Sequence, residues 1–325
     1  MNKNLLTSAA PHINSGHTTS KVMRDVAIAL LPASIAAVVL FGLPALWIIL
    51  VCVGSAVLSE FLFNLILRKK QTIFDFSAVV TGLILALNLS TKVPLWQCAI
   101  GSVFAIIVVK CLFGGLGKNI VNPAIGARVF LLLAFSATVT GGANTVFQST
   151  IADLTAGATP LAGTGLLATG QLNGATLLEL LIGNHGGAIG ETCAIALLLG
   201  YVYLVVRGHI KWYVPFAFVL TVFVLFFVSS NGDAMYALGH VLSGGLLLGA
   251  IFMATDYVTT PISKLGKVVF CIGCGVITFL IRMKFFGMEG LATYPEGVSI
   301  AILVMNMLTP LIEKWTNPRT LGGVR

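Results

Sequence analysis

Apolar runs recur along almost the whole chain, and they constrain its fold more than any other feature. Hydrophobic residues make up 57% of the 325 residues and charged residues only 9%, whereas an ordinary soluble domain is about 25% charged. So few charges would not cover the surface of a soluble protein of this size. The composition excludes a cytosolic enzyme, a disordered chain and a nucleic-acid-binding domain. Because the runs are longer than barrel strands, the sequence predicts an all-α polytopic membrane protein.

We expect about ten transmembrane helices, one for each apolar run: 26–41, 43–66, 75–90, 94–113, 124–139, 189–206, 212–229, 239–255, 268–286 and 298–313. The third, fifth and eighth runs are short for a span of ~20 residues, which predicts tilted, broken or shielded helices. A long loop separates the first five runs from the last five. The chain then divides into a tail with a first five-helix repeat (1–139), a loop (140–188), and a second five-helix repeat with a C-terminal tail (189–325).

The positively charged residues predict the orientation in the membrane. Cytoplasmic loops carry an excess of Lys and Arg. In a ten-helix arrangement most of them fall on one side, namely Lys3, Lys21, Arg24, Arg68, Lys69, Lys70, Lys118, Arg207, Lys211, Lys264, Lys267, Lys314, Arg319 and Arg325. The 140–188 loop has no Lys or Arg, so we expect it outside the cell and both termini in the cytoplasm. Arg282 and Lys284 fit this arrangement least well.

The two sets of five runs resemble each other. Phe113-Gly114 ends the fourth run and Asn122-Pro123 begins the fifth, while Phe286-Gly287 ends the ninth and Tyr294-Pro295 begins the tenth. Since each set holds an odd number of spans, the second set is expected to lie inverted in the membrane. Inverted repeats with short or broken helices are typical of transporters. A stand-alone secondary transporter or channel therefore remains an alternative function.

Cysteine and histidine spacing indicates no metal centre. All six cysteines lie inside apolar runs, where a free Cys packs as a small hydrophobe. Cys271 and Cys274 have CxxC spacing, but a zinc or iron–sulfur site needs four ligands and no second pair lies at a suitable distance. The five histidines do not pair at haem-ligand positions. We expect neither a disulfide framework nor a bound metal.

Four stretches carry a resemblance to a known family: Phe113–Asn119 with Asn122–Ala124 and Arg128–Phe130, Ile182–Asn184 with Gly190–Glu191, Met253–Asp256, and Tyr294–Gly297. On these residues the chain resembles, over nearly its whole length, the RnfD/NqrB family of membrane subunits. RnfD belongs to the Rnf complex, and NqrB belongs to the sodium-pumping NADH:quinone oxidoreductase. The RnfD type is favoured, because NqrB has a longer N-terminal extension.

The resemblance implies a covalently bound FMN. In the family, a Thr in a (Ser/Thr)-x-Ala-Thr motif carries FMN through a phosphoester bond. Thr159 matches best, with Asp153 upstream and Ile182–Asn184 downstream in the family's order, although the first motif position falls on Ala156. Thr176 in a second Gly-Ala-Thr triplet is the alternative. From composition alone, this Thr- and Gly-rich segment is typical of a surface loop.

The resemblance also implies a second flavin. Relatives of the sodium-pump type hold riboflavin near Asn residues that match Asn119 and Asn122. Riboflavin has no phosphate, so amide hydrogen bonds to its ring would suit it. The residues alone also allow a structural explanation, in which the glycines around position 115 form a tight turn and Asn122 caps the helix that starts at Pro123.

Ionisable residues inside apolar runs are costly and are candidates for an ion path. The candidates are Glu60 within the second run, Glu191 at the start of the sixth and Asp256 at the end of the eighth. Each can serve a Na⁺ or H⁺ route, since Na⁺ prefers hard oxygen ligands as other hard cations do. Structural pairing is the alternative, and Lys110 within the fourth run is a candidate partner for Glu60.

The resemblance implies an electron-transfer subunit of an ion-translocating ferredoxin:NAD⁺ oxidoreductase in the bacterial cytoplasmic (inner) membrane. The ferredoxin and nicotinamide sites would lie on partners, which in the family are the other Rnf subunits (A, B, C, E and G). A flavin-attaching transferase would load the FMN, which supplies the redox chemistry. The third possibility is a purely structural anchor for a redox complex. No part of the sequence indicates nucleic-acid binding.

Overall fold

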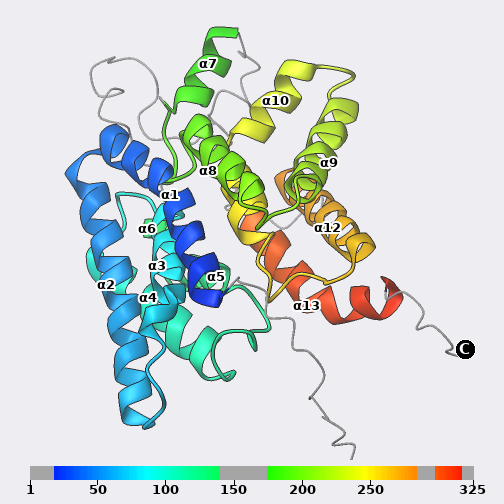
Figure 1. Cartoon of the computed structure of the whole chain (residues 1–325). Coiled ribbons are helices and arrows are strands. Elements are labelled where there is room, and N and C mark those ends of the chain that lie inside the picture. The colour runs from blue at the N-terminus through cyan, green and yellow to red at the C-terminus, as the bar shows by residue number, and fades with distance from the viewer. Residues whose placement is uncertain (1–17, 140–173, 184, 284–296, 317–325) are drawn as a thin grey trace, which may run out of the picture.

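The computed structural model describes residues 18–139, 174–183, 185–283 and 297–316 (Figure 1). In this part of the chain every regular element is a helix, which confirms the all-α prediction. The elements of the first half are α1 (Thr19–Phe41), α2 (Leu43–Ile66), η1 (Ile73–Asp75), α3 (Ser77–Leu87), α4 (Leu95–Phe104), η2 (Ala105–Cys111), α5 (Pro123–Ala134) and α6 (Ser136–Val139). Those of the second half are α7 (Gly174–Ile182), α8 (Ala194–Val206), α9 (Tyr213–Ser229), α10 (Ala234–Leu242), α11 (Leu246–Leu248), η4 (Gly249–Met253), α12 (Lys264–Arg282) and α13 (Val298–Thr316).

Four helices are long and apolar enough to cross a membrane: α1, α2, α12 and α13. A fifth candidate is the pair formed by α10 and the α11–η4 segment, which is bent by 66° at the break between them. The other apolar runs form shorter helices, namely α3, α4 with η2, α5, α8 and α9. All ten predicted runs thus contain helix, but within the described residues four or five meet the length and composition of a span.

Exposed apolar side chains support a membrane location. Large apolar residues that are more than half exposed recur along α1 and α2, for example Ile35, Val39, Trp47 and Leu58. Monomeric soluble proteins rarely expose so much contiguous apolar surface. A lipid environment makes this exposure favourable, because lipid chains are as apolar as the side chains.

Local sequence signals set the helix ends. The side chains of Thr18, Asn122, Asp233 and Ser263 accept hydrogen bonds from backbone N–H groups in the first turns of α1, α5, α10 and α12. Gly42, with φ 72°, separates α1 from α2 by a turn that side-chain-bearing residues rarely adopt. These caps satisfy backbone groups that the bilayer could not hydrate.

Packing divides the helices into two groups that meet along α1 and α8 (Figure 1). In the first group α2 packs against α3 and α4, and in the second α9 packs against α10 and α12. Contacts of α1 with α8, and of α5 with α13, join the groups. The α1–α8 approach is close, because a Cβ atom at Gly200 would lie 2.3 Å from the carbonyl oxygen of Ala29.

Candidate functional site

A cavity, called here the central cavity, is lined by residues of both helix groups. It has about 70 Å³ of space that the centre of a water molecule can occupy, and about 750 Å³ of empty space between atoms when its open mouth is included. Apolar side chains of α1, α3, α8 and η4 form much of its wall. The residues that bring polar side chains to it are Ser77, Thr81, Lys110, Asn119, Asn122, His209, Thr255, Asp256 and Tyr257.

Two π-helical segments border the central cavity. The η2 segment contributes Lys110, and the η4 segment contributes Ile251 and Phe252. A π-helical turn inserts one extra residue into an α-helix and is frequent at functional sites. Both departures from regular α-helix geometry therefore occur at the wall of the central cavity.

The structure brings both predicted flavin-site asparagines to the central cavity. Asn122 Oδ1 accepts a hydrogen bond from the backbone N–H of Ala124 at 3.0 Å, so its side chain caps α5 as the structural explanation predicted. Asn119 is buried, and its Oδ1 atom has no hydrogen-bond partner among the residues that the structure describes. An orphaned buried acceptor is costly unless a ligand donates to it. Asn119 therefore suits the ring N–H group of a flavin.

A glycine turn positions Asn119. Gly114, Gly115 and Gly117 have φ values of 110°, 90° and 93°, a region that favours glycine. At Gly114 a Cβ atom would also lie 2.7 Å from the Lys118 side chain. The turn reverses the chain between η2 and α5, so that Lys110 and Asn119 line the same cavity.

Asp256 lies at the cavity in the turn that follows η4. Its carboxylate accepts hydrogen bonds from the backbone N–H of Val258 and the hydroxyl of Thr259, each at 3.3 Å. Burial raises the pKa of the Asp256 carboxyl above its ordinary value, against the lowering effect of these two bonds.

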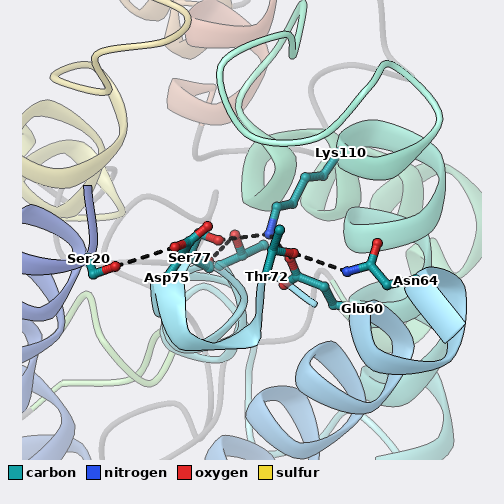
Figure 2. Close-up of polar contacts among 8 residues, drawn as sticks. Ser20, Glu60, Asn64, Thr72, Asp75, Ser77 and Lys110 are labelled. Carbon is teal, nitrogen blue, oxygen red and sulfur yellow. Dashed lines mark hydrogen bonds and ion pairs between the residues drawn. The ribbon is translucent and has the colours of Figure 1, made fainter. Parts of the chain in front are cut away.

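Glu60 and Lys110 form the buried ion pair that the sequence suggested. Lys110 Nζ lies 2.8 Å from Glu60 Oε1, and the two side chains are 2% and 1% exposed (Figure 2). Lys110 lines the central cavity, whereas Glu60 lines a neighbouring space, called here the polar groove. The groove is lined by Thr19, Glu60, Phe63, Asn64, Lys69, Lys70, Thr72, Asp75, Cys111, Gly114, Gly115 and Leu116.

Glu191 lies in a different part of the chain from the two spaces that Asp256 and Glu60 line. It is buried in the segment between α7 and α8, and its Oε1 atom lies against Gly245, at the break between α10 and α11. The neighbouring Gly190 bonds through its N–H to the carbonyl of Leu87 at the end of α3. The central cavity follows α3 from Ser77 to Ile84, one turn before Leu87. Glu191 lines neither the central cavity nor the polar groove, whereas Asp256 lines the first and Glu60 the second.

Comparison with known proteins places the chain in a family. A sequence model of the NQR2, RnfD, RnfE family matches residues 6–322. The chain belongs to this family. It is 43% identical to the D subunit of the Na⁺-translocating ferredoxin:NAD⁺ oxidoreductase complex of Acetobacterium woodii, over 98% of this chain and 96% of that protein.

Two further relatives extend the comparison. The D subunit of the proton-translocating ferredoxin:NAD⁺ oxidoreductase complex of Clostridium ljungdahlii is 37% identical, over 99% of this chain and 98% of that protein. The D subunit of the ion-translocating oxidoreductase complex of Stutzerimonas stutzeri is also 37% identical, over 94% of this chain and 92% of that protein. The family resemblance that four short motifs indicated is confirmed along almost the whole chain.

The structure does not decide between the two FMN candidates of this member of the NQR2, RnfD, RnfE family. Thr159 lies outside the described residues. The backbone at Thr176 belongs to the first turn of α7, but its side chain also lies outside them. The choice between the two therefore remains a sequence prediction.

Sequence reasoning missed one cluster at the cavity of this family member. Asp25 of α1 is buried and pairs with His209 at 2.7 Å and with Arg207 at 3.0 Å. His209 lines the central cavity, and the Tyr257 hydroxyl donates to its backbone carbonyl. The sequence signal that could have revealed this cluster is the position of Asp25, a carboxylate at the edge of an apolar run. The 26–41 boundary had placed Asp25 in the polar tail, where a charge needs no partner.

Proposed function

We propose that this chain is the RnfD component of an ion-translocating ferredoxin:NAD⁺ oxidoreductase complex, in which it carries electrons on bound flavin while an ion crosses the membrane. The observation that carries the proposal is the near full-length similarity to proteins named as the D subunits of such complexes. The ferredoxin and nicotinamide sites would lie on other subunits of the complex (A, B, C, E and G in the family).

The membrane arrangement we propose has ten helices in two inverted repeats, joined by the 140–188 loop. Corresponding helices have corresponding neighbours, which supports this arrangement. The packing of α2 on α3 and α4 matches that of α9 on α10 and α12, and the α4–α5 contact matches the α12–α13 contact. The first helices of the two repeats, α1 and α8, contact each other, and so do the last helices, α5 and α13. A two-fold axis relating the repeats accounts for this pattern.

In this arrangement both termini face the cytoplasm of a bacterial cell, and the 140–188 loop lies outside the inner membrane. The excess of Lys and Arg on the opposite side supports the orientation. An FMN attached to Thr159 would then be held outside the lipid, and a transferase that acts on that face would attach it. Attachment prevents loss of the cofactor to the surroundings.

The central cavity would hold a second, non-covalent flavin of the riboflavin type. A bound flavin supplies reversible electron transfer, while the chain binds and orients it. Asn119 would accept from the ring N–H, and the apolar wall would exclude water.

We propose that Glu60, Asp256 and Glu191 serve the ion route. Glu60 and Asp256 lie near the central cavity, and Glu191 lies near the break in the α10–α11 pair, where a bent helix exposes backbone groups. Relatives named as Na⁺-translocating and as proton-translocating have 43% and 37% identity to the chain, so their names alone do not choose the ion.

Flavin fluorescence of the denatured chain tests the covalent carrier. The wild type, Thr159→Ala and Thr176→Ala would be expressed with the flavin-attaching transferase and compared in a denaturing gel. We expect fluorescence in the wild type and Thr176→Ala that is absent in Thr159→Ala. Loss in Thr176→Ala alone would move the attachment point. A dark wild type would remove the carrier and favour a stand-alone transporter.

A further inference from the structure

The Glu60–Lys110 ion pair lies between the polar groove and the central cavity. Lys110 reaches the central cavity and Glu60 reaches the polar groove, while Leu116 lines both. The groove has about 350 Å³ of space that the centre of a water molecule can occupy, while the Glu60 side chain in its wall is only 1% exposed. The ion pair therefore forms part of the wall that separates the groove from the cavity.

A chain of hydrogen bonds crosses this wall (Figure 2). On the groove side, Asn64 Nδ2 donates to Thr72 Oγ1 at 3.0 Å, and the exposed Thr72 hydroxyl donates to Glu60 Oε1. On the cavity side, Lys110 Nζ donates to Glu60 Oε1 and to Ser77 Oγ, each at 2.8 Å. The chain has two ionisable members, and they are direct neighbours.

One atom of this network lacks a partner. Glu60 Oε2 is buried and has no hydrogen-bond partner among the residues that the structure describes. A pair that served packing alone would be expected to satisfy both carboxylate oxygens, because an unpaired buried acceptor is costly. Glu60 reaches the groove through its other oxygen, because the exposed residue Thr72 donates a hydrogen bond from its hydroxyl to Glu60 Oε1.

We propose that Glu60 and Lys110 form a proton relay from the polar groove to the central cavity, an inference that rests on the proposed function. Groove water donates a proton to the Thr72 hydroxyl, which passes its own proton to Glu60 Oε1 along their hydrogen bond. Lys110 gives one ammonium proton to a basic group in the cavity, such as a reduced flavin ring, and regains one from Glu60. One proton moves from water to the cavity, no electron moves within the chain, and both side chains return to their starting charge.

Other charged groups surround the pair without joining the chain of bonds. Lys69 and Lys70 follow α2 and line the groove, and Asp256 lines the cavity. Asp75 of η1 also lines the groove, but it accepts its hydrogen bond from Ser20 of α1 (Figure 2). Asp75 is therefore a matched control, since it is a carboxylate of the same groove outside the relay.

The test uses the whole purified complex in weakly buffered solution with a pH-indicator dye. A light pulse reduces the flavins through a photosensitiser, and the dye reports the rate of proton uptake. We expect Glu60→Gln to slow uptake about 100-fold, as for loss of a proton-transferring group, and Asp75→Asn to leave it unchanged. Flavin content and the equilibrium pH dependence of the flavin potential stay at wild-type values, because a relay changes a rate.

A double variant separates the relay from a structural role. Glu60→Met with Lys110→Met replaces the pair by apolar side chains, which is often neutral for stability. We expect it to assemble with flavin at a wild-type melting temperature and still take up protons slowly. Wild-type uptake in this variant, or equal slowing in Asp75→Asn, would overturn the relay.

Two further outcomes identify which proposal has failed. If Glu60→Gln alters the Na⁺ dependence of turnover while proton uptake stays fast, Glu60 serves a cation route and the relay is overturned. If the wild-type complex contains no flavin, the proposed function fails, and the relay falls with it. A flavin-loaded complex with unchanged uptake overturns the relay alone.

Discussion

His209 Nε2 lies 2.7 Å from Asp25 Oδ2, and this buried contact ties α1 in the first helix group to the loop after α8 in the second. Arg207 binds the other carboxylate oxygen at 3.0 Å. His209 also lines the central cavity. The contact therefore fixes one wall of the cavity across the boundary between the two groups.

Asp25→Asn should destabilise the protein. Asn cannot replace the charged acceptor that His209 and Arg207 share, and a hydrogen bond to a charged group is typically worth about 1.5–3 kcal/mol. We expect a correspondingly lower melting temperature in detergent. Arg207→Gln is the control, because the Arg207 side chain is half exposed and water screens its interaction with Asp25. Equal losses in both variants would contradict a dominant role for the buried His209 contact.

Close helix packing at Gly200 predicts a second stability effect. A Cβ atom there would lie 2.3 Å from the Ala29 carbonyl oxygen, so Gly200→Ala must push α8 away from α1. We expect a lower melting temperature and a weaker association of the two helix groups. In α2, a Cβ atom at Gly54 would meet nothing within 4 Å. Gly54→Ala should therefore be neutral or stabilising by about 0.5–1 kcal/mol, as in an ordinary helix interior.

Substitutions at the two cavity asparagines should have different effects, one on flavin affinity and the other on protein stability. Asn119→Leu removes an acceptor that no described residue uses, so we expect weaker binding of riboflavin, by about three- to tenfold for one hydrogen bond, at an unchanged melting temperature. Asn122→Ala removes the cap of α5 and should cost about 0.5–2 kcal/mol of stability. Titration of the apo-protein with riboflavin and thermal unfolding measure the two effects. The reverse assignment would place the flavin contact on Asn122.

The helical runs were predictable because each depends on local sequence. Apolar length, the Asn122-Pro123 start signal and the glycine turn near Gly115 act within a few residues, so the chain alone reveals them. The bend of 66° between α10 and α11 lies in the eighth run, for which the sequence predicted a tilted, broken or shielded helix. The sequence did not choose among the three, because Gly244 and Gly245 are also compatible with a continuous helix in lipid.

The site was predictable in its parts but not in its assembly. Asp256 and Glu60 were selected as carboxylates in or at apolar runs and Asn119 by the family resemblance, and the structure places all three at or beside the central cavity. Asp25 and His209 are 184 positions apart, and no periodic pattern connects them. Long-range pairs of this kind follow from the packing of α1 on α8, which depends on the whole fold.

Asp256→Asn should stabilise the protein at neutral pH. The raised pKa means that Asp256 holds its proton more tightly in the folded chain than in the unfolded one. Its contribution favours folding below the ordinary pKa of 3.8 and is lost as pH rises through the folded pKa. Asn removes this titration, so the gain in melting temperature should be largest at neutral pH and shrink toward pH 3.8.

Melting curves across this pH range test the sign of that effect. Asp233→Asn is the control, because Asp233 is exposed and Asn caps α10 equally well, so it should show no such gain. If Asp256→Asn instead lowers the melting temperature at neutral pH, the carboxylate is stabilised in the folded protein by a bound cation. Repeating the melting curves at several Na⁺ concentrations would then test whether Na⁺ is that cation. A ligand that binds the folded state raises the melting temperature as its concentration rises.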